Sequence, residues 1–382
     1  RNHTSSKLTS PRSAGTASWA ACTTCGSASI SAYTRSAAES PCCTCAQKAE
    51  RLSTGKKKRS RLWMNKYHAP AVTTPCATLN PPRYTSNAIA AYPHYVFSGQ
   101  WSIATNGVIT LTGLQPATRY AYRLLLDDLP IGGSESEFTT LATPGPTSRT
   151  RFVLGSDLYY ADPGWSVYDR MAARNPDFLL MLGDQIAVDV PVPIDATRAA
   201  YDRKHRVYWA EPHWADFMRR IPSFMVWDDH EIWNDWSDGK SGRYLVARHS
   251  YEAYQGSHNP SPLAPGETYY TFTAGPIDFF ILDTRTFRSP GYAPDGPEKT
   301  MLGEEQKAAL KAWLLASEAP FKVIGSSVTF SDFGTASDTL LTTSDSWYAY
   351  AAERADLLAF VRDNCIPGVL FLTGDQHWAG VF

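Results

Sequence analysis

Long apolar runs are absent from this chain of 382 residues, although 43% of its residues are apolar. A helix needs about 20 mostly apolar residues to cross a bilayer. The longest apolar runs here are far shorter, so the sequence predicts no transmembrane segment. The chain begins with Arg1, and the residues after it lack the apolar core of a signal peptide, so no export leader is visible.

Acidic residues are almost missing from residues 1–83, where thirteen Lys and Arg stand against only Glu39 and Glu50. Because the whole chain has a net charge of -1, the remainder is clearly acidic. An acidic body attracts cations and repels nucleic acid. We therefore expect no nucleic-acid recognition, although the charge balance does not exclude a phosphodiester substrate.

Large aliphatic residues are also scarce in residues 1–83, which are rich in Ser, Thr and Ala and have no steady period. Such a segment has little with which to form a core, so we predict that it is disordered or poorly specified. Four of its cysteines, Cys22, Cys25, Cys42 and Cys45, have the C-x2-C spacing of a zinc ribbon. Their surroundings favour the alternative, which is a set of incidental cysteines in a disordered segment.

Residues 84–145 have a different sequence pattern, in which apolar and polar residues alternate as they do in half-buried strands. The order Leu114, Pro116, Thr118, Tyr120 resembles the tyrosine corner of fibronectin type III domains. In that corner the Tyr hydroxyl bonds the backbone at the end of a β-sandwich. We predict a small, partial all-β domain of this kind.

From residue 148 to residue 382, short apolar strands alternate with amphipathic helical stretches. The expected strands are "RFVLGSD", "DFLLMLGDQ", "SFMVWDDHE", "FKVIGSSVTF", "GVLFLTGDQH" and a pair with a turn at Gly275-Pro276. Helices are expected between them, with Pro212 breaking the longest helical stretch. This alternation predicts an α/β fold whose helices cover the sheets.

Several of these strands end in the same way, with an apolar run followed at once by polar residues. Ligand sites in α/β folds form at the carboxyl ends of strands, so neighbouring strands would bring these residues together. The residues in question are Asp157, Asp184, Asp228, Asp229, His230, Asp283, Asp375 and His377. A single strand-end Asp is more often a cap or turn residue, but converging carboxylates are costly unless cations neutralise them. We therefore predict a site for two dications, which need several anionic ligands.

The ordered motifs "GSD", "GDQIAVD", "WDDHEIWND", "ILDTRTFR" and "GDQHW" resemble those of the calcineurin-like metallophosphoesterases, and specifically the PhoD-type alkaline phosphatases. The resemblance covers roughly residues 150–382. It implies a metallophosphoesterase-type β-sandwich flanked by helices, and hydrolysis of a small-molecule phosphate ester by a hydroxide that two metal ions activate. Secretion, a periplasmic location or the cell surface is typical of this family.

The resemblance also assigns metal ligands, position by position. Asp157 stands at the first motif, and Asp184 matches the carboxylate that bridges both metals. Asp229 falls where the wider superfamily has a metal-binding Asn. Asp375 and His377 match the paired ligands that go one to each metal.

Three further residues receive catalytic roles from the same resemblance. His230 falls on the histidine that donates a proton to the leaving group, and Asn234 fits the Asn of the longer PhoD-type motif. Arg285 is a candidate for steadying the phosphate, together with Arg288. The alternative for both arginines is a salt bridge that supports their loop.

Departures from the family pattern bear on the metals. Ala187 stands where a Tyr often binds ferric iron, Tyr159 where many relatives have a metal-binding His, and Ser326 and Ser327 where a superfamily His ligand is expected. An almost all-oxygen second site suits Ca²⁺. The resemblance implies two metal ions, Ca²⁺ and Fe³⁺, with Mn²⁺, Mg²⁺ or Zn²⁺ as alternatives.

Two alternatives to a catalytic member of the family remain at this point. The first is a non-catalytic relative that binds metal or a partner, because family members continue with more strands after the position of residue 382. The second alternative is a surface or adhesion module, in which the strand-end acids would have no common function. The sequence does not indicate the oligomeric state.

Overall fold

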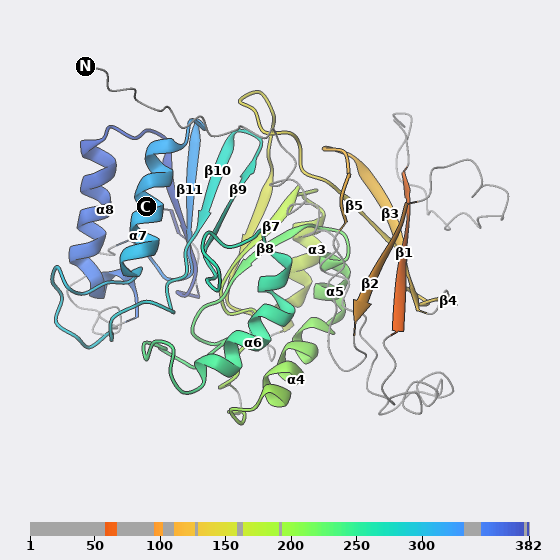
Figure 1. Cartoon of the computed structure of the whole chain (residues 1–382), viewed down its shortest axis with the longest axis horizontal. Helices are drawn as coiled ribbons and strands as arrows, with labels where there is room; N and C mark the ends of the chain where they lie inside the picture. The colour runs from red at the N-terminus through yellow and green to blue at the C-terminus, as the bar shows by residue number, and fades with distance from the viewer. Residues whose placement is uncertain are drawn as a thin grey trace, which may run out of the picture.

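The structure is a computed structural model, and it describes residues 58–66, 95–101, 111–126, 129–158, 163–190, 193–331, 345–377 and 380–381. The predicted four-cysteine motif lies outside these residues. Three sheets are present among them, and helices flank two of the three. Figure 1 shows an all-β unit on one side of the molecule and the helices α7 and α8 on the other (Figure 1).

The first sheet is antiparallel and has the strand order β2-β1-β3-β4, with β5 pairing to β3. Its strands are β1 (Lys58–Lys66), β2 (Tyr95–Trp101), β3 (Arg119–Leu126), β4 (Leu129–Pro130) and β5 (Ser136–Thr139). Strand β1 lies inside the segment that the sequence predicts to be disordered. It pairs with β2 on one side and with β3 on the other, so long-range pairing forms it and its own composition does not reveal it.

Tyr120 has the hydrogen bond that a tyrosine corner requires. Its ring is buried against Phe138 of β5, with ring centroids 5.8 Å apart. Its hydroxyl accepts a hydrogen bond from the backbone N–H of Gln115 at 2.8 Å. The local geometry therefore agrees with the predicted corner, while assignment of residues 84–145 to the fibronectin type III class stays a prediction.

The other two sheets form the α/β part of the chain. One is fully parallel in the order β6-β7-β8, and the other has the order β12-β11-β10-β9, in which only β9 is antiparallel. The strands of the first are β6 (Phe152–Gly155), β7 (Phe178–Leu182) and β8 (Ser223–Val226). Those of the second are β9 (Tyr270–Ala274), β10 (Ile277–Ile281), β11 (Phe321–Ser326) and β12 (Val369–Thr373).

Aromatic side chains join these two sheets. Phe224 of β8 stacks on Phe272 of β9 with centroids 3.7 Å apart, and Phe178 of β7 meets Phe279 of β10 edge to face at 5.6 Å. Burying such large apolar surfaces stabilises the contact by the hydrophobic effect, with a further gain from the ring geometry. The predicted sandwich-like α/β fold is therefore present.

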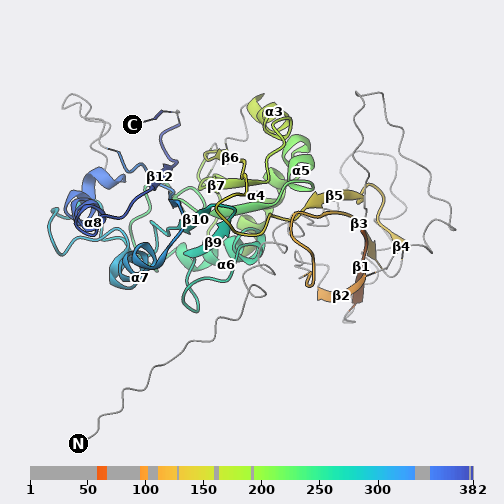
Figure 2. The same cartoon turned by 90° about the horizontal axis from the view of Figure 1, so that it is seen from above.

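Helices cover the sheets on two sides. They are α3 (Val167–Ala172), α4 (Arg198–Trp209), α5 (Pro212–Met218), α6 (Tyr244–Tyr254), α7 (Gly303–Ala316) and α8 (Ala351–Asp363). Side chains of α4, α5 and α6 pack into one core cluster with β7 and β8, while α7 and α8 pack against β10 and β11 in a second cluster. Figure 2 shows these two groups of helices apart from each other (Figure 2).

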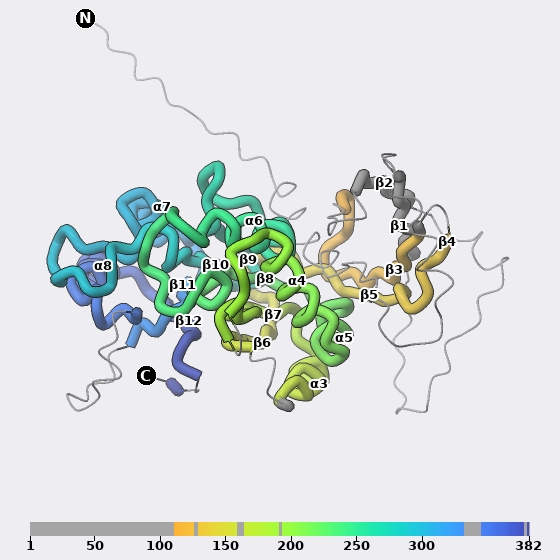
Figure 3. The backbone as a smooth tube through the Cα atoms, turned by 90° about the horizontal axis from the view of Figure 1, so that it is seen from below, coloured from red at the N-terminus to blue at the C-terminus, as the bar shows by residue number. Residues whose placement is uncertain are grey.

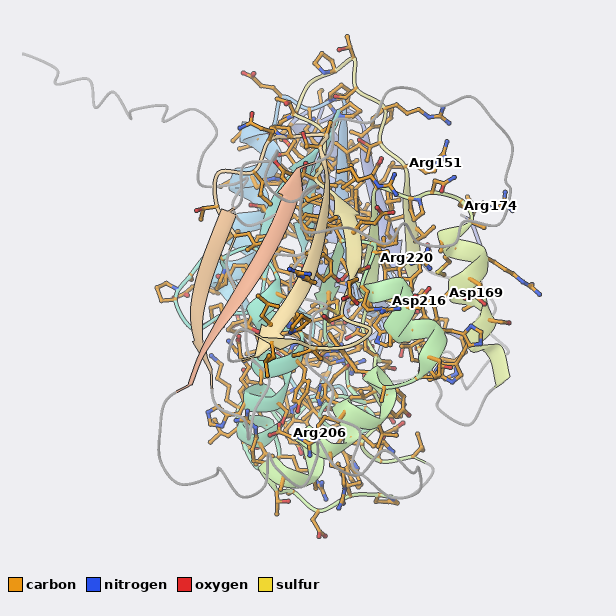
Figure 4. All side chains as sticks on the ribbon, turned by 90° about the vertical axis from the view of Figure 1, so that its right-hand side faces the viewer. Arg151, Asp169, Arg174, Arg206, Asp216 and Arg220 are labelled. Atoms are coloured by element: carbon orange, nitrogen blue, oxygen red, sulfur yellow. The ribbon has the colours of Figure 1, made fainter. Side chains whose placement is uncertain are left out.

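Helix α5 begins where the sequence predicts a break. Pro212 occupies its first turn, where the missing N–H costs nothing. The helix lies beside α3 (Figure 3). Tyr168 of α3 meets Trp214 of α5 edge to face, with ring centroids 4.8 Å apart. Its polar face points outward, where Asp216 pairs with Arg220 at 2.5 Å (Figure 4). Among the described residues, none of the helices combines the length and apolar character that a membrane span requires.

Candidate metal centre

Strand-end residues from both α/β sheets meet in one place. Asp157 follows β6, Asp184 follows β7 and Asp229 follows β8, while Asp375 and His377 follow β12. Within each of four overlapping sets, ligand atoms lie within 4.8 Å of one another. The sets are Asp157–Asp184–His377, Asp184–Asp229–His230, Asp228–Asp229–Asp375 and Asp229–Asp235–Asp345.

All five residues predicted as metal ligands belong to these sets, so the structure brings them together. Their individual roles as ligands remain predictions. Two acids that the sequence did not single out, Asp235 and Asp345, also belong to them. Asp283, which was also expected to converge, belongs to none of the sets found among the described residues. It is fully buried and accepts from the backbone N–H groups of Arg285 and Thr286. It has the turn-capping role that a single strand-end Asp often has.

The backbone turns sharply at these strand ends. Asp157, Asp184, Asp375 and His377 all have positive φ angles, of 59°, 55°, 77° and 56°. Asp and His tolerate this left-handed region better than branched residues do, and such strained positions cluster at functional sites. Gly183 has φ +97°, and a Cβ there would lie 2.4 Å from the Cβ of Asp228. The turn after β7 therefore requires glycine at this position.

The meeting of these acids is electrostatically costly without a cation. Burial, together with the neighbouring charge of Asp229, raises the pKa of Asp184 well above its usual value. Burial likewise raises the pKa of Asp228 to about 6, although Arg285 opposes the shift. The pKa of Asp375 is also raised well above its usual value, by burial and by Asp228. Dications would relieve this repulsion and favour the charged carboxylates.

The donor set fits divalent or trivalent cations. It consists of carboxylate oxygens with a histidine nitrogen available at His377 and at His230. The buried Oδ2 atom of Asp228 has no hydrogen-bond partner among the described residues. A buried carboxylate oxygen without a donor is expensive unless it ligates an ion. Oxygen-rich sets suit Ca²⁺, Mg²⁺ and Mn²⁺, and the nitrogen donors also allow Fe or Zn²⁺.

His230 stands at the edge of this cluster and is oriented by a carboxylate that the sequence analysis did not assign. Its Nδ1 lies 2.6 Å from Oδ1 of Asp189. Burial lowers the pKa of His230, but the hydrogen bond to Asp189 and the charge of Asp229 outweigh this and raise it to about 9 in the metal-free protein. The signal for Asp189 was present, because it ends the quoted motif "GDQIAVD".

Asn234 lies next to the same pair. Its backbone N–H donates to Oδ2 of Asp189 at 2.9 Å, and its side-chain amide donates to Asp235 at 2.7 Å. The residue is exposed. Asn234 therefore shares the Asp189 carboxylate with His230, and its backbone helps to fix that carboxylate, while its catalytic role stays a prediction.

Arg285 has surroundings that favour the salt-bridge alternative over phosphate binding. It is fully buried, and its guanidinium donates to Asp228, Asp229 and Asp345. Arg288, also buried, donates to Asp345 at 2.7 Å. These arginines neutralise three carboxylates from two separate segments, the turn after β8 and the segment at Asp345. The donors of Arg285 are used within the protein, which supports the salt-bridge alternative, while a phosphate contact by Arg285 stays a prediction.

Positions where the sequence departs from the family pattern have structural roles. Ser327 donates to Oδ1 of Asp228 at 2.6 Å, and Ser326 donates to the carbonyl of Val328 at 2.7 Å. Ala187 is buried. Tyr159 lies outside the described residues.

Comparisons with known proteins agree with this arrangement. Residues 152–382 match the model of the family described as PhoD-like phosphatase. Alkaline phosphatase D of Bacillus subtilis (strain 168) is 28% identical over 323 residues, which cover 73% of this chain and 54% of that protein. Purple acid phosphatase 23 of Arabidopsis thaliana is 24% identical over 241 residues, covering 56% and 49%. The chain thus spans about half the length of these curated relatives.

A solved structure shares the fold. The structure titled "Structure of PhoD" superposes with a TM-score of 0.67 at 22% identity, and the match covers 84% of this chain and 65% of that one. At this level of identity the likeness concerns the fold alone. It agrees with the two sheets and flanking helices described above.

Proposed function

This chain belongs to the PhoD-like phosphatase family, whose model matches residues 152–382, and on that premise we propose that it hydrolyses phosphate esters of small molecules with the help of metal ions. The observation that carries the proposal is the meeting of strand-end ligand residues in overlapping sets, with His230 beside them. A surface or adhesion module would have no need for such a set.

The residues that would hold the metals are Asp157, Asp184, Asp229, Asp375 and His377. Bound cations supply Lewis-acid activation of water and neutralise charge on the phosphoryl group. Asp184 belongs to two of the sets and Asp229 to three, so either could be shared between two ions, and the resemblance assigns the shared role to Asp184. We expect Ca²⁺ in the oxygen-rich part and Fe³⁺ or another transition metal nearer the histidines.

His230 is the proposed general acid. The hydrogen bond to Asp189 favours the protonated imidazole, which is the form that a general acid requires. The hydrogen bond from Nδ1 to Asp189 fixes the ring and leaves Nε2 as the atom that donates the proton to the leaving oxygen. Asp189 acts through His230, so it is a positioning residue.

Arg285 and Arg288 have an electrostatic supporting role in this proposal. They hold Asp228, Asp229 and Asp345 in place and balance part of their charge. The preference between monoesters and diesters depends on the shape of the cleft, so both classes belong in the test.

The leaving group provides the sharpest test of this assignment. Purified protein would be assayed with Ca²⁺, Mn²⁺ and Fe³⁺ on p-nitrophenyl phosphate, bis-p-nitrophenyl phosphate and an alkyl phosphate. Alkoxide leaving groups need a proton far more than p-nitrophenolate does. We expect His230→Ala to lower kcat on the alkyl phosphate by about 10²–10⁴ and much less on the nitrophenyl ester.

The matched control is His249→Ala, which removes an exposed histidine of α6. It should leave both rates unchanged. Unaltered turnover of the alkyl phosphate by His230→Ala would remove the general-acid role, and absence of hydrolysis of every ester by the metal-loaded wild type would overturn the proposed activity.

A further inference from the structure

Glu231 is the last acid of the "DDHE" run, and the mechanism above does not use it. It is fully buried, yet it belongs to none of the candidate ligand sets among the described residues. Its carboxylate instead accepts hydrogen bonds from backbone N–H groups. One oxygen, Oε2, accepts from Asp184 at 3.0 Å and from Asp228 at 2.8 Å. The other, Oε1, accepts from Gln185 at 2.6 Å.

These backbone groups lie in two different turns. Asp184 and Gln185 follow β7, and Asp228 follows the neighbouring parallel strand β8. A single side chain therefore ties together the two turns that present carboxylates to the metal centre. In the reverse direction, the backbone N–H of His230 donates to Oδ1 of Asp184 at 3.1 Å. The two turns are thus fixed to each other by hydrogen bonds in both directions.

Two buried side-chain amides, those of Gln255 and Gln185, extend this hydrogen-bond network. Gln255, just after α6, donates its side-chain amide to Oε1 of Glu231 at 3.4 Å and to Oε1 of Gln185. The amide of Gln185 in turn donates to the carbonyl of Val226 in β8 at 3.1 Å. Both Glu231 oxygens are occupied by donors from the protein, which leaves this carboxylate poorly suited to ligate an ion itself.

We propose that Glu231 is a positioning residue of the metal centre, holding the Asp184 turn and the Asp228–Asp229 turn at the separation that metal ligation requires. The inference rests on the proposed function in one respect, which is that cations bind at these turns. Partners outside the ligand shell that orient the ligands commonly contribute 10–100-fold to metal affinity.

A Mn²⁺ titration of chelator-treated protein, followed by electron paramagnetic resonance, tests the inference directly. Glu231→Gln preserves the shape but turns an amide NH₂ toward backbone donors, so one accepting oxygen is lost. Glu231→Asp keeps the charge but shortens the reach by one methylene. The matched control is Glu305→Gln, which alters an exposed glutamate of α7. Circular dichroism and thermal unfolding in chelator report on the fold.

We expect both Glu231 variants to fold and to bind Mn²⁺ about 10–100-fold more weakly than wild type, with the aspartate variant less affected than the glutamine variant. The control should bind as wild type does. Mn²⁺ affinity within twofold of wild type in folded variants would overturn the inference. Failure of both variants to fold in conditions where the control folds would also overturn it, because Glu231 would then be a general determinant of the fold.

Activity measured on the same samples separates this inference from the proposed function. If wild type hydrolyses esters and the folded variants keep their Mn²⁺ affinity, only the positioning role fails. If the variants lose affinity but loaded wild type hydrolyses no ester, the positioning role stands and the proposed activity fails. Absence of Mn²⁺ binding by wild type would overturn both.

Discussion

The Nδ1 atom of His230 lies 2.6 Å from Oδ1 of Asp189, a residue 41 positions away in the chain. The same carboxylate accepts from the backbone of Asn234 through its other oxygen. Asp189 is nearly buried, and its pKa is lowered because the contacts with His230 and Asn234 outweigh the effect of burial. It therefore stays ionised and fixes the orientation of the imidazole ring.

Replacing this carboxylate should impair catalysis without removing metal. We expect Asp189→Asn to lower kcat on an alkyl phosphate by roughly 10–100-fold, which is part of the contribution of a general acid, since His230 would lose its orientation. Metal content should stay at the wild-type level. Steady-state kinetics and metal analysis check both statements, with the exposed Asp195→Asn as control. A variant with full activity would show that Asp189 does not position His230.

The buried arginine at position 285 should matter for stability and not for substrate affinity. Arg285→Met leaves three buried carboxylates without their main partner, and breaking such a pair typically costs about 3–5 kcal/mol of unfolding free energy. Urea denaturation measures this loss, and Arg203→Met, at an exposed position of α4, is the control. A rise in KM for the ester with unchanged stability would instead return Arg285 to a phosphate-binding role.

A buried histidine of α4, His205, predicts how stability depends on pH. Burial lowers the pKa of His205 from its usual 6.5 to about 4. Below pH 6.5 the unfolded chain takes up a proton that the folded protein excludes, so this residue lowers stability as the pH falls toward 4. At pH 4.5 the loss should reach about 2–3 kcal/mol.

Denaturation curves of wild type and His205→Gln between pH 7.5 and 4.5 isolate this contribution, because all other groups titrate in both proteins. The wild type should lose stability more steeply than the variant. His249→Gln, which changes an exposed histidine, should follow wild type. Parallel pH profiles for wild type and His205→Gln would contradict the prediction.

The tyrosine corner of the all-β unit should contribute to stability through the hydroxyl of Tyr120. Tyr120→Phe removes the hydroxyl that accepts from Gln115 and leaves that backbone N–H without its partner, at a cost of about 1–3 kcal/mol. Thermal unfolding measures the effect, with the exposed Tyr292→Phe as control. Equal stability of the two variants would show that the corner contributes nothing.

Much of the fold and of the site could be predicted from local patterns. Apolar runs ending in acids marked the strands, and parallel strands must bring such ends to one edge, so Asp184 and Asp229 could be placed together without coordinates. Helix α5 was marked by its proline. The positive φ at Asp157 and Asp184 was not readable, since it follows from how the strand ends pack.

What the sequence did not reveal depends on contacts between distant segments. Asp345 pairs with Arg285 across 60 residues, and no local pattern marks the pair. Strand β1 is formed by its partners on both sides, within a segment whose composition indicates disorder. Glu231 received no role from the sequence, and only its hydrogen bonds to three backbone N–H groups distinguish it from the nearby Asp229.

The central claim, that strand-end carboxylates hold a pair of metal ions, is tested most directly by the metal content of purified protein. Inductively coupled plasma mass spectrometry should find about two ions per chain in wild type. In Asp184→Asn, which alters the carboxylate shared by two ligand sets, both should be depleted and ester hydrolysis lost. Wild-type protein that carries only trace metal, and that hydrolyses phosphate esters equally well after exhaustive chelation, would contradict the account.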